Sequence, residues 1–291
     1  MAKRGKFIVI EGIDGSGKSS QIELLKGIYE DMGRSNEFYF TAEPTKSEVG
    51  KKIREILSSN EEINNSVIAT LFFIDRIKHI TDKGGINDIL DKGINVICDR
   101  YYYSNIVYQG YGEYEDFIYN MHRDCPDILT PDLVIHMSID PEIALQRINK
   151  GRKPEELERY ETLEKLTETE KKYSDLIVKI DSERRPDENI TLAHIPADKD
   201  IETVFKWIYS IIEDVIREEK ERYCIYKCFG TVEQIAELKN HLLMNGYDFS
   251  VNEKDGLEIS IHEDGMDYIQ TIMDDRGIDY RIIDFEWKIK G

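Results

Sequence analysis

The stretch with the clearest chemistry lies near the N-terminus, where a glycine-rich octamer ends in Lys18 and Ser19. It has the pattern G-x-x-x-x-G-K-[ST], in which glycines let the backbone fold around a polyphosphate with its N–H groups pointing inward. A lysine at this place reaches the β- and γ-phosphates, and the hydroxyl that follows ligates Mg²⁺. The residues expected to bind a triphosphate are Gly12, Ile13, Asp14, Gly15, Ser16, Gly17, Lys18, Ser19 and Ser20.

The segments on either side of the octamer distinguish a phosphate site from a glycine-rich turn before an ordinary helix. Residues 7–10 are apolar β-formers, and apolar residues recur along one side of the following stretch at Ile22, Leu25, Ile28 and Met32. A strand, a glycine loop and a helix N-terminus together form an anion site, because the helix contributes partial positive charge. We therefore predict that the chain binds a nucleoside triphosphate.

Two further predicted strands lead into charged residues. Residues 95–98 lead into Asp99 and Arg100, which could hold the metal shell and clamp a phosphate. Residues 37–41 form the other strand and lead to Glu43. In a doubly wound sheet the carboxyl ends of the strands face the ligand crevice. Glu43 is therefore either a site residue or a solvated loop charge.

Aromatic and amide side chains suited to a planar base occur in two places. Phe72 and Arg76 lie one turn apart on a predicted helix, so they could face a cleft together. Alternatively, Arg76 packs its stem and keeps its head in water. Residues 101–111 are rich in tyrosine and contain Asn105, Tyr108 and Gln109. This run could read a base, or it could form a packing face.

A cluster of basic residues interrupts an otherwise acidic chain. Arg147, Arg152, Lys153 and Arg159 surround a break between two predicted helices at residues 149–154. A mobile flap that closes over phosphates would have this composition, and so would a solvated helix-loop-helix.

The elements that must position these residues alternate between strand and helix through residue 218. The alternation predicts an α/β P-loop domain over residues 1–218, with a parallel sheet flanked by helices. Residues 219–291 read as strand, helix, strand, strand, helix, strand, which predicts a small ferredoxin-like α+β domain. That fold names no function by itself, so an interface, a ligand sensor and a second activity all stay open.

The composition narrows the partners and the compartment. The net charge is −19, with 58 acidic against 39 basic residues, which disfavours binding to nucleic acid or anionic membranes. No apolar run is long enough to span a membrane or to form a signal peptide, so a cytoplasmic location is expected. Cys98, Cys125, Cys224 and Cys228 form no C-x-x-C pair and are expected to be structural.

Residues 5–218 resemble the thymidylate kinase family, and in particular its archaeal members. The resemblance rests on FIVIEGIDGSGKSSQ (7–21), EPT (43–45), LFFIDR (71–76), DRYYYSNIVYQG (99–110), PDLVIHMSIDPEIALQRI (131–148) and ERYE (158–161). It implies transfer of the γ-phosphate of ATP to a deoxynucleoside monophosphate, most simply dTMP giving dTDP, with Mg²⁺ as cofactor and a homodimer as the assembly.

The resemblance also implies roles for single residues. Lys18 and the loop amides would hold the ATP phosphates, and Ser19 and Asp99 would hold Mg²⁺. Asp14 would lie near the metal and the acceptor sugar, and Arg100 would bind the acceptor phosphate.

In the acceptor site that the resemblance implies, Phe72 would stack on thymine and Arg76 would bond its edge. Asn105 and Gln109 would read the base, and Tyr108 would pack under the deoxyribose and disfavour a 2′-hydroxyl. The acceptor-binding residues expected are Asp14, Glu43, Phe72, Arg76, Arg100, Asn105, Tyr108 and Gln109.

Gly15 belongs to a variation within the family, whereas two features depart from its pattern. One is a flap rich in glutamate (Glu155, Glu156, Glu158), which works against phosphate attraction, and the other is Ala42. Gly15 occupies the place where some members carry a catalytic arginine, so Arg147 or Arg152 of the flap would have to join Lys18, Asp99 and Arg100 in catalysis. Ala42 stands where the family usually has an arginine before Glu-Pro. The alternatives are therefore a related kinase with another acceptor, or a non-catalytic nucleotide-sensing regulator that acts through the C-terminal domain.

Overall fold

The computed structural model divides the chain into two compact units, Met1–Ile216 and Arg217–Gly291. It describes residues 4–59, 63–151, 162–183, 189–216, 220–229, 231–244, 249–252, 257–262 and 266–289.

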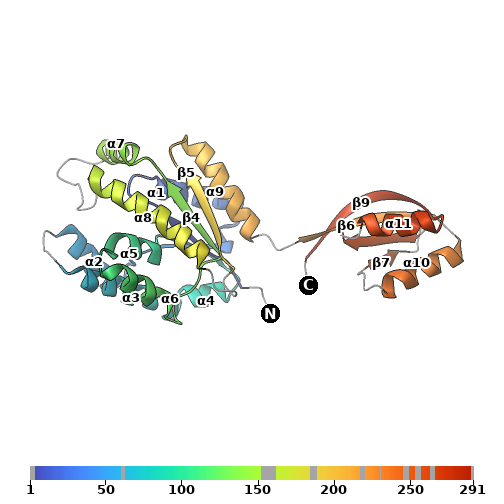
Figure 1. Cartoon of the computed structure of the whole chain (residues 1–291), viewed down its shortest axis with the longest axis horizontal. Helices are drawn as coiled ribbons and strands as arrows, with labels where there is room; N and C mark the ends of the chain where they lie inside the picture. Colours follow the sequence, from blue (N-terminus) through green and yellow to red (C-terminus); the bar gives the residue numbers. More distant parts are fainter. Residues whose placement is uncertain are drawn as a thin grey trace. The chain divides into compact units, whose positions relative to one another are not determined.

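The first unit is built on a parallel sheet of five strands (Figure 1). They are β1 (Phe7–Glu11), β2 (Phe38–Ala42), β3 (Asn95–Asp99), β4 (Leu133–Ser138) and β5 (Thr191–Pro196), in the order β2-β3-β1-β4-β5. All neighbouring strands pair in parallel, and every residue of β1 is buried. A continuous apolar run suits such a strand, because helices cover both faces of a parallel sheet. The α/β expectation for this part of the chain is confirmed.

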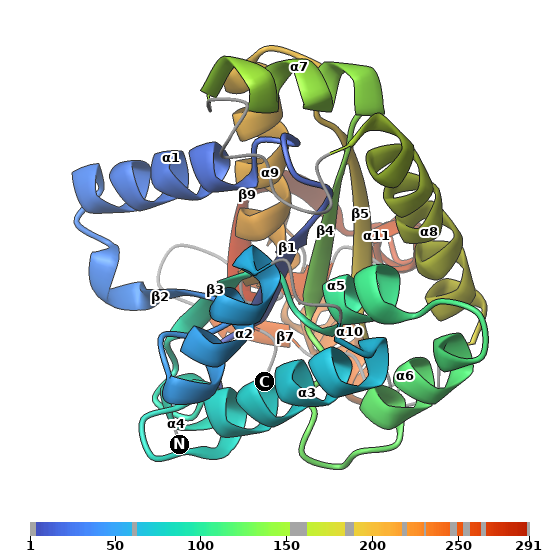
Figure 2. The same ribbon diagram turned by 90° about the vertical axis from the view of Figure 1, so that its left-hand side faces the viewer.

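Helices cover the two faces of this sheet (Figure 2). Helix α1 lies beside α9 on one face, and α5 lies beside α8 on the other. The helices of the first unit are α1 (Lys18–Asp31), a 3-10 turn η1 (Ser35–Glu37), α2 (Glu48–Ser58), α3 (Asn65–Thr81), α4 (Ile86–Leu90), α5 (Tyr102–Gln109), α6 (Tyr114–Arg123), α7 (Pro141–Gly151), α8 (Leu163–Ser182) and α9 (Ile201–Ile216).

Periodicity in the sequence explains which helix faces are buried. In α8 the buried residues Leu166, Thr169, Tyr173, Leu176 and Ile180 recur every three or four positions, which gives one apolar stripe. In contrast, α5 is buried at every position from 103 to 109, because α3, α6 and α8 all pack against it. The tyrosine-rich run of residues 101–111 thus contributes to the packing of the core.

The second unit has its own antiparallel sheet and core. Its elements are β6 (Lys220–Phe229), α10 (Val232–Met244), β7 (Phe249–Asn252), β8 (Leu257–His262), α11 (Met266–Asp275) and β9 (Asp279–Ile289), and the strand order is β7-β8-β6-β9. Leu238 and Leu242 of α10 pack with Ile269 and Met273 of α11 and with Cys228 of β6. The assignment of this unit to a ferredoxin-like fold stays a prediction.

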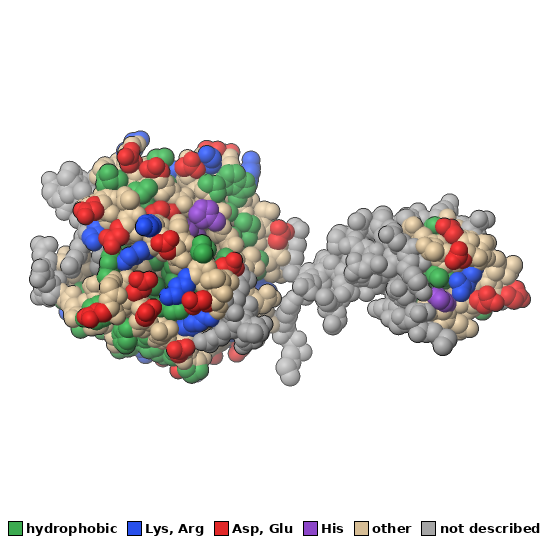
Figure 3. Space-filling view, viewed as in Figure 1, with side chains coloured by type: hydrophobic (Ala, Val, Ile, Leu, Met, Phe, Trp, Pro, Cys, Tyr) green, Lys and Arg blue, Asp and Glu red, His purple; other side chains and the backbone are tan. Residues whose placement is uncertain are grey.

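The charged surface, the hydrophobicity of the helices and the cysteines complete the description of the fold. Figure 3 shows Asp and Glu side chains interspersed with Lys and Arg side chains over the face of the first unit that it draws. Among the described residues, no helix is long and apolar enough to cross a membrane. Cys98 and Cys228 are buried free thiols and Cys125 is a half-buried one, whereas the side chain of Cys224 lies outside the described part.

Candidate active site

The glycine-rich loop passes so close to its neighbours that two of its glycines cannot be replaced without a shift. A Cβ at Gly12 would lie 2.6 Å from the backbone oxygen of Met137, and one at Gly15 would lie 2.4 Å from that of Ala144. Gly15 also has a φ of +79°, in the left-handed region that favours glycine. In this conformation an arginine at position 15 would collide with α7.

Lys18 starts α1, and its side chain folds back over the phosphate loop. Its Nζ donates to the backbone oxygens of Gly12 at 2.8 Å and of Ile13 at 2.9 Å, and the residue is 6% exposed. Burial, followed by the nearby Arg100 cation, lowers the pKa of Lys18 to about 8, although three surrounding carboxylates act in the opposite direction. A bound polyphosphate would replace the two carbonyls and restore a favourable partner for the ammonium group.

Arg100 follows β3 and points back toward the phosphate loop. Its Nη2 donates to Oδ1 of Asp14 at 2.6 Å, and its Nη1 donates to Oγ of Ser104 at 3.1 Å. The guanidinium also lies 5.3 Å from the centroid of the Tyr108 ring. Its φ of +66° is the only positive φ of a non-glycine residue among those described, so the loop after β3 is held in a strained form.

Glu11 is the group that holds this loop, and our sequence analysis did not single it out. One carboxylate oxygen accepts from the backbone N–H of Tyr101 at 2.7 Å, and the other accepts from Ser104 Oγ at 2.7 Å and from the Tyr173 hydroxyl at 2.9 Å. Burial raises the pKa of Glu11, although Arg100 and these donors lower it in part. Glu11 thereby ties α8, through Tyr173, to the loop that carries Arg100.

All eight residues expected to bind the acceptor line one pocket of about 220 Å³. Helices α2, α3 and α5 line this pocket together with the phosphate loop and the segments after β2 and β3. The full lining is Asp14, Glu43, Pro44, Arg54, Leu57, Phe72, Arg76, Arg100, Tyr101, Ser104, Asn105, Tyr108 and Gln109.

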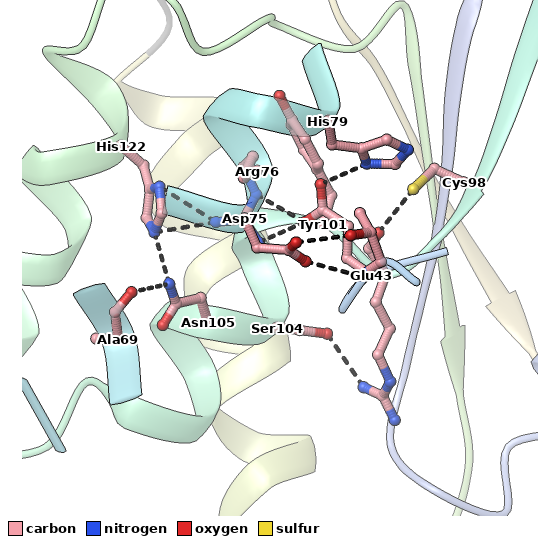
Figure 4. A network of polar contacts seen from close by, with 12 residues as sticks. Glu43, Ala69, Asp75, Arg76, His79, Cys98, Tyr101, Ser104, Asn105 and His122 are labelled. Carbon is pink, nitrogen blue, oxygen red and sulfur yellow. Dashed lines mark hydrogen bonds and ion pairs between the residues drawn. The ribbon is translucent and has the colours of Figure 1, made fainter. Parts of the chain in front are cut away.

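Glu43 and Arg76 form a buried ion pair at this pocket, as Figure 4 shows. Oε2 of Glu43 accepts from Nε of Arg76 at 2.8 Å and lies 2.6 Å from its Nη2, while Oε1 lies 3.0 Å from Nδ1 of His79. The side chains of Arg76 and Glu43 are only 1% and 2% exposed. The alternatives of a solvated loop charge at Glu43 and a head in water at Arg76 are therefore wrong. Each residue already uses part of its bonding capacity on the other.

Asp75, beside Arg76, fastens the loop after β2 to α3. Its carboxylate accepts from the backbone N–H of Thr45 at 2.7 Å and from the hydroxyls of Thr45 and Ser47 at 2.6 Å each. Pro44, which lines the pocket, is thereby held in place.

Two amide oxygens of the pocket have no partner among the described residues. They are Oδ1 of Asn105 and Oε1 of Gln109, both buried. A buried acceptor without a donor costs free energy, so such groups point to a ligand that carries N–H donors.

A larger groove of about 740 Å³ adjoins the acceptor pocket. Its lining includes Ser19 and Asp99, and Oδ1 of Asp99 is buried without a partner in the described structure. Arg54 lines both hollows and was missed by the sequence analysis; it donates to the backbone oxygens of Pro44 and Thr45 at 2.7 Å each. Ala42 lines the groove as well, so Arg54 supplies a guanidinium near the place where this chain lacks one.

Of the two flap arginines considered, only Arg147 falls within the described residues. It lies on α7, and its Nη1 would be 3.9 Å from a Cβ built at Gly17 of the phosphate loop. Arg152, with Lys153 and Arg159, lies outside the described residues.

A phosphate loop between the first strand and first helix of a parallel sheet, with a pocket beside it that is lined by charged, amide and aromatic side chains, defines a P-loop phosphotransferase. The family model for thymidylate kinase matches residues 10–189. The chain therefore belongs to the thymidylate kinase family and is a nucleoside monophosphate kinase.

Individual relatives agree with this membership. A thymidylate kinase of Francisella tularensis subsp. holarctica is 33% identical over 215 residues, which are 72% of this chain and 96% of that protein. A probable thymidylate kinase of Methanocaldococcus jannaschii is 44% identical over 143 residues, 49% of this chain and 69% of that protein. The solved structure of thymidylate kinase from Candida albicans superposes with a TM-score of 0.57 at 25% identity, over 72% of this chain and 92% of that one.

Proposed function

We propose that the chain transfers the γ-phosphate of ATP to dTMP and releases ADP and dTDP. The observation that carries this proposal is the acceptor pocket beside the phosphate loop, in which every residue expected for a thymidylate acceptor converges. Because phosphoryl transfer depends on positioning and charge stabilisation, such convergence is what catalysis requires.

The base end of the pocket favours thymine. Oδ1 of Asn105 and Oε1 of Gln109 are acceptors without donors, and thymine presents an N3–H group to such an acceptor. Phe72 would stack on the ring, Arg76 would donate to a base oxygen with the N–H groups that Glu43 leaves free, and Tyr108 would pack under the deoxyribose.

The phosphate end of the pocket is cationic. Arg100 would hold the acceptor phosphate, and its contact with Asp14 fixes the direction of the guanidinium. Arg54 would supply the second contact that Ala42 cannot make. Lys18 would bind the ATP phosphates, and Arg147 or Arg152 of the flap would stabilise the charge of the transferred group.

We also propose that Mg²⁺ is held by the Ser19 hydroxyl and by Asp99. The fit rests on the buried, unpartnered Oδ1 of Asp99 and on the hard oxygen donors that this ion prefers. When bound, the ion would neutralise negative charge on the phosphates during transfer.

The alternatives of another acceptor and of a non-catalytic regulator are tested by one assay. ADP release is measured with ATP, Mg²⁺ and each of dTMP, dUMP, dCMP, UMP and thymidine, with Lys18→Ala as the blank. We expect turnover with dTMP that disappears in the blank. Turnover with another acceptor alone would refute the acceptor, and silence with all acceptors while ATP still binds would refute the kinase proposal.

Four broader proposals concern the whole chain. We place it with archaeal-type members, which the 44% identity to the Methanocaldococcus relative supports. The domain boundary would lie at residue 218, with a ferredoxin-like unit over 219–291 whose strand order β7-β8-β6-β9 suits that fold. A cytoplasmic location without nucleic-acid or membrane partners is consistent with the net charge of −19. Limited proteolysis should cut first near residue 218 and leave two resistant fragments.

The fourth proposal is a homodimer formed through α3 and α6. Val67, Ile74 and Phe117 are exposed apolar side chains on these two helices, which pack against each other. A second copy would remove this apolar surface from water. Sedimentation equilibrium of the full chain should give twice the monomer mass, and a monomer at high concentration would contradict the proposal.

A further inference from the structure

His122 lies behind the acceptor pocket and takes no part in the roles described above. It belongs to the last turn of α6 and is 2% exposed. Its ring is packed between Phe73 of α3 and Tyr102 of α5, with centroid distances of 5.4 and 5.5 Å. A polar ring in so closed a place is expected to serve a hydrogen bond.

That hydrogen bond goes to Asn105, as Figure 4 shows. Nδ2 of Asn105 donates to the backbone oxygen of Ala69 at 3.1 Å and lies 3.0 Å from Nε2 of His122. Because a backbone oxygen can only accept, Nδ2 is the atom on this side of the amide. Both of its hydrogens are then used, so Nε2 of His122 must accept the second one. Oδ1 remains on the other side without a partner in the described structure.

We infer that His122 is a positioning residue that holds the Asn105 amide with its oxygen free for the acceptor base, and thereby sets the preference for bases that carry a hydrogen on N3. The inference rests on the proposed function, because it assumes that a pyrimidine monophosphate enters the pocket. Thymine and uracil carry a hydrogen on N3, whereas cytosine carries a lone pair there that would face the lone pairs of Oδ1. A site built in this way rejects cytosine by leaving the oxygen unpaired.

The surroundings of His122 keep it able to accept. Arg76 Nη1 lies 3.4 Å from both ring nitrogens, and the other neighbours described are the Asn105 amide and two aromatic rings. Burial and the Arg76 cation lower the pKa of His122 well below its usual range. The ring is therefore neutral at pH 7, with its proton on Nδ1 and a lone pair on Nε2.

The test compares kcat/KM for dTMP, dUMP and dCMP in the full chain and in His122→Phe, which keeps a ring but removes the acceptor. We expect the dTMP/dCMP ratio to fall about tenfold, mainly through KM for dTMP, because the amide loses one of the two hydrogen bonds that hold its orientation and keeps only the one to Ala69. The dTMP/dUMP ratio should stay constant, since both bases carry N3–H. His122→Gln, which offers a carbonyl oxygen, should restore the dTMP/dCMP ratio.

Phe73→Leu is the matched control, because it alters the packing of the His122 ring without touching the amide. A His122→Phe enzyme that keeps the wild-type dTMP/dCMP ratio would overturn the inference, and so would an equal loss in the control. If His122→Phe does not fold, the ¹⁵N chemical shifts of His122 in the wild-type chain test the inference. We expect Nε2 to be unprotonated, and a protonated Nε2 would overturn the inference. A wild type without dTMP turnover would overturn this inference together with the proposed function, and is thereby distinguished from the other outcomes.

Discussion

The buried pair of Glu43 and Arg76 should show a larger coupling free energy than an exposed pair such as Lys52 and Glu55. Three nitrogen–oxygen contacts of 2.6 to 3.0 Å converge on the Glu43 carboxylate, and both charged side chains are almost fully enclosed. Replacing Glu43 by glutamine keeps the shape but leaves the guanidinium of Arg76 buried without its counter-charge. Such an uncompensated charge costs about 3–5 kcal/mol. For a unit of this size, the melting temperature should fall by roughly 6–20 °C.

The measurement is a double-mutant cycle of Glu43→Gln and Arg76→Met by urea denaturation. A Trp287→Phe background leaves Trp207 of α9 as the fluorescent reporter of the first unit. The double variant should recover most of the loss, because it buries no unpaired charge. A coupling free energy below about 1 kcal/mol would refute the reasoning.

The exposed pair of Lys52 and Glu55 is the matched control. Their side chains are 62% and 67% exposed and lie 3.2 Å apart on one face of α2. Water screens this contact, so the same cycle should give a coupling of about 0.5 kcal/mol or less. A similar coupling in both cycles would show that burial does not decide the strength of the Glu43 pair.

Three substitutions in the phosphate loop and the pocket lining, two of them with a matched control, should have different effects. Lys18→Met should abolish transfer yet stabilise the fold by about 3 kcal/mol at pH 7, since burial lowers the pKa of Lys18 from 10.5 to about 8. Between about pH 8 and 10.5 the unfolded wild type binds more protons than the folded one, so the wild type gains stability as the pH rises through this range. The difference in free energy of unfolding between Lys18→Met and the wild type should therefore shrink. A difference that does not change with pH in urea titrations would contradict this. Gly15→Ala should destabilise by about 1–3 kcal/mol and weaken ATP binding, because of its φ of +79° and a Cβ only 2.4 Å from a backbone oxygen of α7. Gly27→Ala, on the open face of α1, should instead stabilise the fold by about 0.5–1 kcal/mol. If both alanine substitutions shift the melting temperature equally, the contact between Gly15 and α7 is not what restricts position 15. Arg54→Ala should raise KM for dTMP about tenfold with little change in kcat, whereas Lys52→Ala on the same helix should change neither.

Local patterns in the sequence were enough to predict the sheet and the position of the phosphate loop. The apolar run into Gly12 and the helical spacing after Lys18 are interactions between near neighbours, so they can be recognised in one dimension. The same holds for Asp99 and Arg100, because any residue that follows a strand of a parallel sheet arrives at the ligand edge. Glu11 is the last residue of β1, so the same rule about strand ends could have identified it as a candidate site residue.

The residues that the sequence could not identify act across long separations. Tyr173 meets Glu11 over 162 positions, and His122 meets Asn105 from another helix. Arg54 reaches the acceptor pocket only because α2 lies against α3. Burial decided the state of Glu43 in the same way, because a glutamate in the sequence carries no sign of whether water or an arginine will face it. Composition and spacing thus determined which chemistry the chain can perform, and tertiary packing decided which groups are desolvated and in which direction each one points.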